Sequence, residues 1–147
     1  MKKWKLGLVM IFLLSIGVLT GKYTFIEEVS REIRVGYQDG GNPEVIRFEK
    51  VVTNIEDQSA IDNIMMIYLN KEEIDSPDID FNHPDVYISV MSPKQHTVLI
   101  DSRVWFHKEG AVIAERLGDS WEKVQYFSVS PQDAGYLKET IQYQSVN

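Results

Sequence analysis

The chain has 147 residues, with 22 acidic and 15 basic side chains, three histidines and no cysteine. The absence of cysteine excludes thiol catalysis, iron–sulfur clusters, thiolate zinc sites and a thioether-linked lipid. Residues 23–147 hold all 22 acids but only 11 of the 15 bases, a net charge of −11, which disfavours nucleic acid as a partner because binding to phosphates rests on Lys and Arg.

The first 25 residues predict a membrane-directed segment. Three lysines precede an uncharged run over residues 6–20, and Lys22 follows it. A spanning helix needs about 20 largely apolar residues, so residues 6–25 can serve as the anchor if the Lys22 side chain extends towards the headgroups. The positive-inside rule then places the N-terminus in the cytoplasm and the rest of the chain outside. The sequence therefore predicts a single-pass protein of the cell membrane.

A cleaved signal peptide is the alternative interpretation of the same segment. Signal peptides share the basic start and the apolar run, but they end in small residues before the cleavage site. Cleavage after Gly21 would put Leu19 where a small side chain is preferred. We therefore divide the chain into an anchor or uncleaved signal segment (1–25) and an extracytoplasmic domain (26–147), which would be secreted if cleavage occurs.

Two strands and a helix are predicted in the first half of the domain. Residues 31–37 alternate between apolar and polar side chains, and after a turn the range 44–52 resumes as a second strand, which together read as a hairpin. Either Ile46 and Phe48 or Val45 and Val51 would face inward on the second strand.

A helix to about Asn70 follows the hairpin. Thr53 and Glu56 have the spacing of a capping box, and Asp57 is a competing N-cap. Ile61, Ile64, Met65 and Tyr68 recur on one helical face. The second half of the domain reads as a polar loop, four strands and a helix that Ser130 caps; their ranges are 71–84, 85–91, 97–106, 111–116, 121–129 and 130–143.

The predicted fold class is α+β. The element order is ββ-α-ββββ-α after the N-terminal transmembrane or signal helix, and the short connections favour an antiparallel sheet with both helices packed on one face. The sequence leaves open whether the first two strands hydrogen-bond to the later four.

The loop before residue 86 is the densest candidate for a metal site. Asp78, Asp80 and Asn82 alternate like the ligands that open a calcium-binding loop. The match ends there, because His83 stands where Gly is expected and Ser89, the twelfth residue, stands where a bidentate Glu is expected. The alternative is a solvated loop in which Asp and Pro set the turns. The predicted calcium ligands are Asp75, Asp78, Asp80, Asn82 and Asp85.

Trp105 is the candidate interface residue. Its position between Val104 and Phe106 places it on the opposite side of the strand from those two side chains. Trp105 therefore either docks a partner on the sheet face away from the main core or packs into the interior.

The histidines do not form a recognisable catalytic motif. They occur at predicted loops or strand ends, without HExxH spacing, and no G-x-S-x-G nucleophile motif is present. A concave site that gathers His83 or His107 with Asp78, Asp80 or Asp85 would indicate an exported metal-dependent hydrolase.

Residues 53–141 resemble small exported domains of Gram-positive bacteria, often lipoproteins, whose function is unknown. The resemblance rests on the helix with Ile61 and Ile64, the strand 84–88, the strand 104–106 and the run 127–130 into a last helix. It implies no activity. We expect a membrane-tethered extracytoplasmic binding or accessory domain. It would contact the membrane through residues 6–25 and would bind an unknown protein or cell-wall partner, with calcium as the one cofactor considered. The alternatives are the exported metal-dependent hydrolase and a calcium-binding module.

Overall fold

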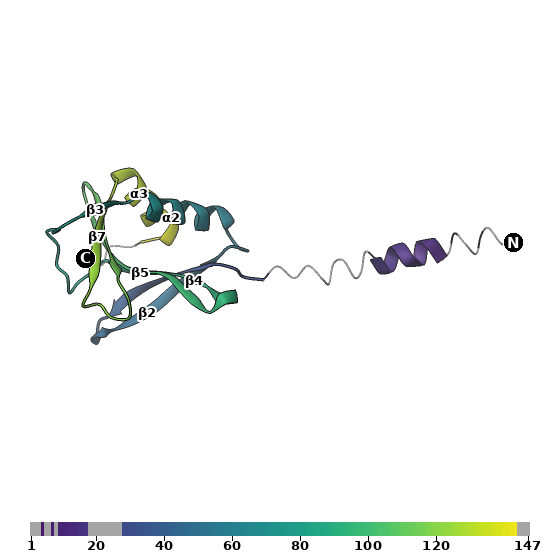
Figure 1. Cartoon of the computed structure of the whole chain (residues 1–147), viewed down its shortest axis with the longest axis horizontal. Coiled ribbons are helices and arrows are strands. Elements are labelled where there is room, and N and C mark those ends of the chain that lie inside the picture. Colours follow the sequence, from purple (N-terminus) through teal and green to yellow (C-terminus); the bar gives the residue numbers. More distant parts are fainter. Residues whose placement is uncertain (1–3, 5–6, 8, 18–27, 144–147) are drawn as a thin grey trace.

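The computed structural model describes residues 4, 7, 9–17 and 28–143 (Figure 1). Residues 9–17 are helical, and the domain begins after residue 28. Its elements, in chain order, are β1 (Glu32–Asp39), β2 (Asn42–Thr53), α2 (Gln58–Asn70), β3 (Glu72–Ile74), β4 (Val86–Ser92), the 3₁₀ turn η1 (Pro93–Gln95), β5 (Thr97–His107), β6 (Gly110–Arg116), β7 (Val124–Val129) and α3 (Pro131–Ile141).

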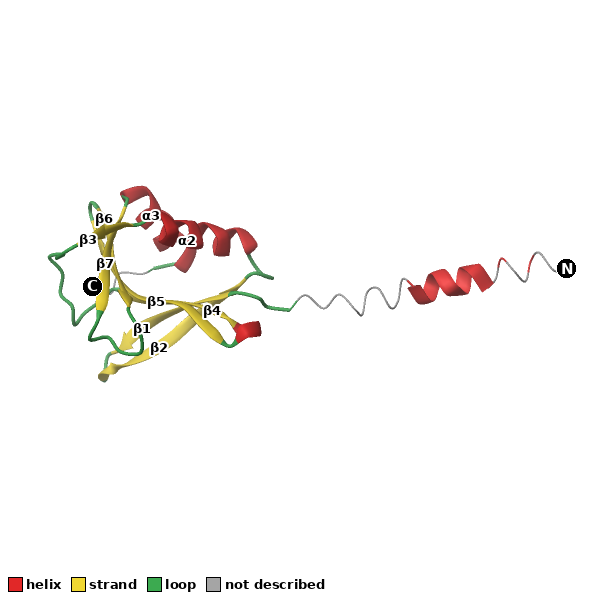
Figure 2. Cartoon of the chain, viewed as in Figure 1, coloured by secondary structure: helices red, strands yellow, loops and turns green. Residues whose placement is uncertain are grey.

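The seven strands form one antiparallel sheet in the order β2-β1-β4-β5-β6-β7-β3. The sheet bends between β5 and β7, and α2 and α3 lie together on one of its faces (Figure 2). The predicted α+β class and the packing of both helices on one face are confirmed. The open question about the first hairpin is also answered, because β1 pairs with β4 through Ile33 and Val90.

The main core lies between the helices and the inward side of the sheet. Ile33 and Val35 of β1 are fully buried there, as their alternation predicts. Burial of large aliphatic side chains at about 25 cal/mol per Å² is the main force that holds the helices on the sheet. The helical residues in this core are Ala60, Ile61, Ile64, Ile67, Tyr68, Ala134, Leu137 and Ile141.

Two strand boundaries differ from the prediction. β3 lies inside the expected polar loop 71–84, and β7 begins at Val124 rather than at residue 121. β3 has only three residues and no apolar alternation, and it forms because β7 offers an unpaired edge whose backbone groups it satisfies. Trp121 instead places its ring 4.1 Å from the guanidinium carbon of Arg103.

The start of α2 uses both of the caps that the sequence offers. Thr53 and Glu56 form the reciprocal hydrogen bonds of a capping box, at 3.1 and 3.3 Å. These bonds close the turn before the helix, whereas Asp57 is the N-cap and accepts a hydrogen bond from the backbone N–H of Ala60 at 2.9 Å. The helix therefore begins at Gln58.

Neither predicted set of inward side chains on β2 is buried. Val45, Phe48 and Val51 are 45–48% exposed, because β2 is the outermost strand. Its register against β1 also shifts between Val35 and Gly36, which changes the side of the sheet that successive residues face.

The described part of the chain contains no helix long and apolar enough to cross a membrane. The spanning helix predicted for residues 6–25 finds no support there. Residues 6, 8 and 18–25 of that segment lie outside the described residues.

Candidate functional site

A groove of about 460 Å³ lies between the 75–85 segment and strands β5, β6 and β7. Most of its lining is apolar and comes from Ile74, Ile79, Trp105, Phe106 and Val112. Its polar lining residues are Asp78, Asp85, His107 and Ser128. The groove therefore brings together nominated residues from two segments of the chain, Asp78 and Asp85 of the 75–85 segment with Trp105 and His107 of β5.

Trp105 lies beneath the 75–85 segment. It packs with Val112 and Ala114 in a second apolar cluster, apart from the core under the helices, as its position on the strand predicts. Its indole N–H donates a hydrogen bond of 2.8 Å to the backbone oxygen of Asp80. Trp105 is only 6% exposed, so its predicted role as an interface residue would have to use the small part of the ring that borders the groove.

The tip of the 75–85 segment is held by its own side chains. The Asp80 carboxylate lies 2.8 Å from Nδ1 of His83 and accepts the backbone N–H of Asn82 at 3.1 Å. The hydrogen bond from His83, followed by that from Asn82, lowers the pKa of Asp80 below its ordinary value. Phe81 adds an edge-to-face contact with Tyr126 at 5.6 Å between ring centroids. These contacts keep the segment over the sheet.

Asp85 fastens the end of the same segment. One carboxylate oxygen accepts the backbone N–H of Phe106 at 2.6 Å, and the other accepts the Tyr143 hydroxyl at 2.9 Å. Burial and then the hydrogen bond to Asp85 raise the pKa of Tyr143 to about 12, so this hydroxyl stays protonated and able to donate at neutral pH. Both oxygens of Asp85 are therefore engaged in holding β5 and the C-terminal segment together.

The predicted calcium ligands do not converge. Asp75 and Asp78 are exposed, whereas Asp80 and Asp85 have the separate partners described above. Over residues 28–143 and the described part of the N-terminal segment, no group of three or more His, Asp or Glu side chains is placed to hold a metal ion. Calcium binding stays a prediction that needs a direct measurement.

His107 shares the groove with Asp78, Asp85 and Ser128, which is part of the arrangement expected of a hydrolase. Catalysis by Ser, His and Asp requires that the three side chains be hydrogen-bonded in sequence. Nδ1 of His107 accepts a hydrogen bond of 3.3 Å from the backbone N–H of Glu109. In the described structure no hydrogen bond links Ser128, His107 and either carboxylate, so the groove has the residue types of a triad without its connections.

Sequence reasoning missed the apolar part of the groove. Ile79 is the one aliphatic residue between Pro77 and Phe81 in an otherwise polar run, and that isolation was the available signal. Ile74 and Ser128 gave no signal, because the pairing of β3 with β7 brings them together.

Comparison with protein-family models, with curated proteins and with solved structures gives no match for this chain.

Proposed function

We propose that this chain is a membrane-tethered extracytoplasmic binding domain, whose groove takes an apolar side chain next to a basic residue of a protein partner. The single observation that carries the proposal is the composition of the groove, which has an apolar floor and an acidic rim. Both carboxylate oxygens of Asp85 in this groove already accept hydrogen bonds, from the Phe106 N–H and from the Tyr143 hydroxyl.

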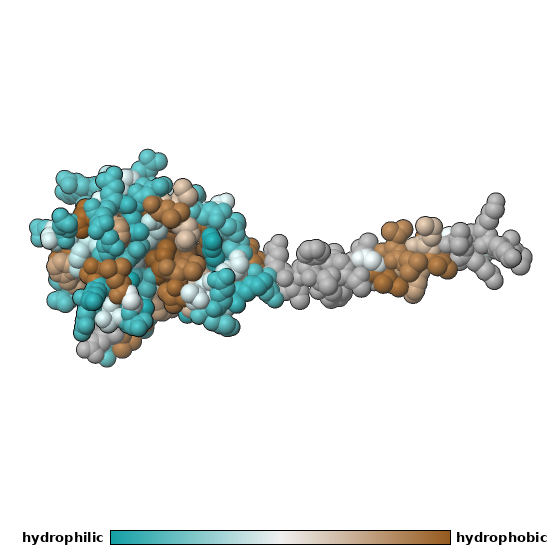
Figure 3. Space-filling view, viewed as in Figure 1, coloured by the Kyte–Doolittle hydropathy of each residue, from teal (hydrophilic) through white to brown (hydrophobic). Residues whose placement is uncertain are grey.

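The N-terminal segment supports the tether. The large apolar side chains of residues 9–16 are 41–68% exposed, and the helix is apolar on the side seen in Figure 3, whereas the visible surface of the domain is largely polar. A helix that is apolar all round is stable only where apolar surroundings receive it. The lysines before the run then orient the segment with the domain outside the cell.

The groove supports binding rather than catalysis. Asp85 would be the natural acid or base, but the Phe106 N–H and the Tyr143 hydroxyl occupy its two oxygens. A catalytic base must be able to reach the proton it removes. The remaining apolar walls resemble the small hydrophobic pockets into which interface anchors insert.

Charge selects the partner. Asp78 is exposed at the rim, and residues 23–147 carry a net charge of −11. Complementary charge raises association rates and suppresses wrong partners. A partner segment with a Leu, Phe or Trp beside a Lys or Arg matches both the walls and the rim.

Labelled peptides test the proposal with the full-length chain in a nonionic detergent. Peptides that place an apolar residue beside Lys or Arg should bind in fluorescence anisotropy, whereas the same peptides with Glu should not. Asp78→Asn should weaken binding by about threefold or more and reduce its salt dependence, because one rim charge is lost. Glu122→Gln, an equal change of charge outside the groove, is the matched control.

Ile79→Ala separates the apolar contribution from the electrostatic one. It removes part of one wall and should weaken binding about tenfold, since a lost contact of this size costs about 1–3 kcal/mol. Equal binding of acidic and basic peptides, or binding that neither variant changes, would refute the proposal. Cooperative thermal unfolding of each variant checks that the fold persists.

A further inference from the structure

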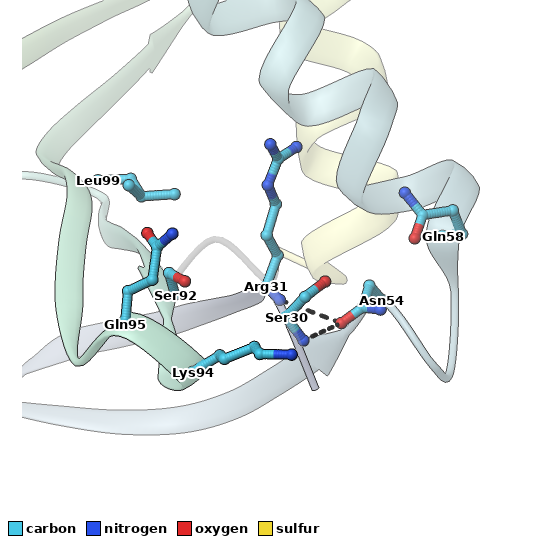
Figure 4. A pocket seen from close by; sticks show the side chains of 8 residues that line it. All are labelled: Ser30, Arg31, Asn54, Gln58, Ser92, Lys94, Gln95 and Leu99. Atoms are coloured by element: carbon cyan, nitrogen blue, oxygen red, sulfur yellow. Dashed lines mark hydrogen bonds between the residues drawn. The ribbon is translucent and has the colours of Figure 1, made fainter. Parts of the chain in front are cut away.

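A second cavity, of about 330 Å³, lies beside residues 30 and 31, near the start of the described part of the domain (Figure 4). Four parts of the chain build it: the residues that lead into β1, the turn before α2, the β4–η1 corner and β5. The side chains that the argument uses are Ser30, Arg31, Asn54, Ser92, Lys94 and Gln95.

We propose that this cavity binds a phosphate group, and that a phospholipid headgroup of the membrane that holds the tether supplies it. The lipid source rests on the proposed tether, whereas phosphate binding itself does not. The observation behind the proposal is that two cations line the cavity and no carboxylate does, in a domain whose net charge is −11.

The arginine of this cavity is held in position through its backbone. The Asn54 side-chain oxygen accepts hydrogen bonds from the backbone N–H groups of Ser30 and Arg31, at 2.9 and 3.1 Å (Figure 4). The Asn54 N–H in turn donates to the Arg31 backbone oxygen at 3.0 Å. Among the described residues no carboxylate pairs with the Arg31 guanidinium, which leaves its planar donors free for an oxyanion.

Ser92 adds a hydrogen-bond donor to the wall of the cavity. The residue is 7% exposed and lines the cavity, and in Figure 4 its hydroxyl points towards the space between Gln95 and Arg31. The hydroxyl makes no capping bond to the turn that follows and has no hydrogen-bond partner within residues 28–143. A hydroxyl on the cavity wall can donate a hydrogen bond to a phosphate oxygen.

Lys94 already binds an anionic oxygen at the rim. Its ammonium nitrogen lies 3.3 Å from a carboxylate oxygen of Glu28, and both side chains are about two-thirds exposed. An exposed ion pair of this kind contributes about 0–1 kcal/mol. A phosphate can therefore displace Glu28, which acts as a weak internal competitor.

The position of the cavity selects the lipid as source. Arg31 lies six positions after residue 25, the end of the predicted anchor. An extended chain spans at most about 3.6 Å per residue, so Arg31 lies within about 22 Å of the anchor's end. The tether keeps lipid headgroups at a high local concentration beside the cavity. Binding therefore does not require a long-range attraction between the membrane and the domain, whose net charge is negative.

The first experiment titrates inorganic phosphate into the full-length chain in a maltoside detergent and follows the N–H resonances by NMR. Saturable shifts should occur at Arg31, Ser92 and Gln95. The double variant Arg31→Gln/Lys94→Gln should weaken binding at least tenfold. Lys108→Gln/Lys123→Gln makes the same change of charge away from the cavity and should leave the affinity unchanged.

Two further variants exclude a simple loss of structure. Glu28→Gln removes the competitor and should tighten phosphate binding by about two- to fivefold, which unfolding could not do. Ser92→Ala should weaken it severalfold at constant charge. Absence of saturable shifts, or equal loss in the control pair, would overturn the proposal.

Vesicles identify the source of the phosphate. In phosphatidylglycerol–phosphatidylcholine vesicles, the same shifts should appear without added phosphate, and in digalactosyldiacylglycerol vesicles, which lack phosphate, they should not. Shifts with inorganic phosphate alone would overturn the headgroup as the source. Flotation of the chain with both vesicles reports the tether separately, so failure of the tether is distinguishable from failure of the cavity.

Discussion

Asp85 is the residue whose replacement best separates a structural carboxylate from a catalytic or metal-binding one. Its oxygens accept the Phe106 N–H at 2.6 Å and the Tyr143 hydroxyl at 2.9 Å, which joins three segments far apart in the sequence. Asp85→Ala would leave both donors without this acceptor. Because the residue is half-buried, water can replace only part of what is lost.

The magnitude follows from the two bonds. Hydrogen bonds to a charged group contribute about 1.5–3 kcal/mol each, and solvent access lowers this figure, so Asp85→Ala should cost about 2–4 kcal/mol of unfolding free energy. Asp85→Asn keeps one acceptor oxygen and offers an amide that the Tyr143 oxygen can accept, so it should cost about 1 kcal/mol. Asp78→Ala, at an exposed position of the same groove, should stay within about 0.5 kcal/mol.

Urea unfolding of the full-length chain, followed by circular dichroism, measures the three variants. With a slope of about 2 kcal/mol per molar urea, in the middle of the usual range for small proteins, Asp85→Ala should lower the midpoint by about 1–2 M. The expected order of destabilisation is Asp85→Ala, Asp85→Asn, then Asp78→Ala. If Asp85→Ala unfolds like Asp78→Ala, the carboxylate is not a structural fastener, and an acid or ligand role at this position would have to be reconsidered.

Four further outcomes can be checked. Gly110→Ala should destabilise the domain by about 3 kcal/mol or more in the same urea assay, because φ at this position is +136° and the new Cβ would clash with the backbone oxygen of Val129. Gly135→Ala, within α3 where a new Cβ meets no neighbouring atom, should instead stabilise the domain by about 0.5–1 kcal/mol. The folded-state pKa of Tyr143 is raised from 10.0 to about 12, so the protonated hydroxyl contributes its full share of the unfolding free energy below pH 10 and loses it as the pH rises towards 12. The difference in urea midpoint between the native chain and Tyr143→Phe should therefore shrink over that pH range. A melting scan with and without calcium tests the predicted site in loop 75–85: a rise of several degrees would support it, and a shift of less than about one degree would count against it. Mass spectrometry of native membranes should recover the intact 17.0 kDa chain, and a shortened species in the medium would show cleavage instead.

Local sequence signals located most of the secondary structure. Alternation in residues 31–37 marked β1, and Ser130 followed by Pro131 marked the start of α3, where the Ser130 hydroxyl accepts the Asp133 N–H at 3.2 Å. These signals are local because a strand alternates every second residue and a helix start must satisfy its own free N–H groups.

The candidate site was only partly visible in the sequence. Trp105, Asp78, Asp85 and His107 were nominated, and they do line one groove. The sequence could not predict the roles of these residues, because the hydrogen-bond partners of a carboxylate come from other segments. Asp85 accepts a hydrogen bond from the hydroxyl of Tyr143, which lies 58 positions further along the chain.

Composition and local patterns were sufficient to predict the α+β class and the positions of most elements, and they set the acidic charge and the apolar N-terminal run. Each of these depends on composition or on neighbours within a few residues. Three other features come from long-range packing: β3 completes the sheet at β7, Trp105 lies under the 75–85 segment, and Arg31, Ser92 and Lys94 line one cavity. Those features need residues that are tens of positions apart, and the free energy that brings them together comes from burial of the shared core rather than from any local pattern.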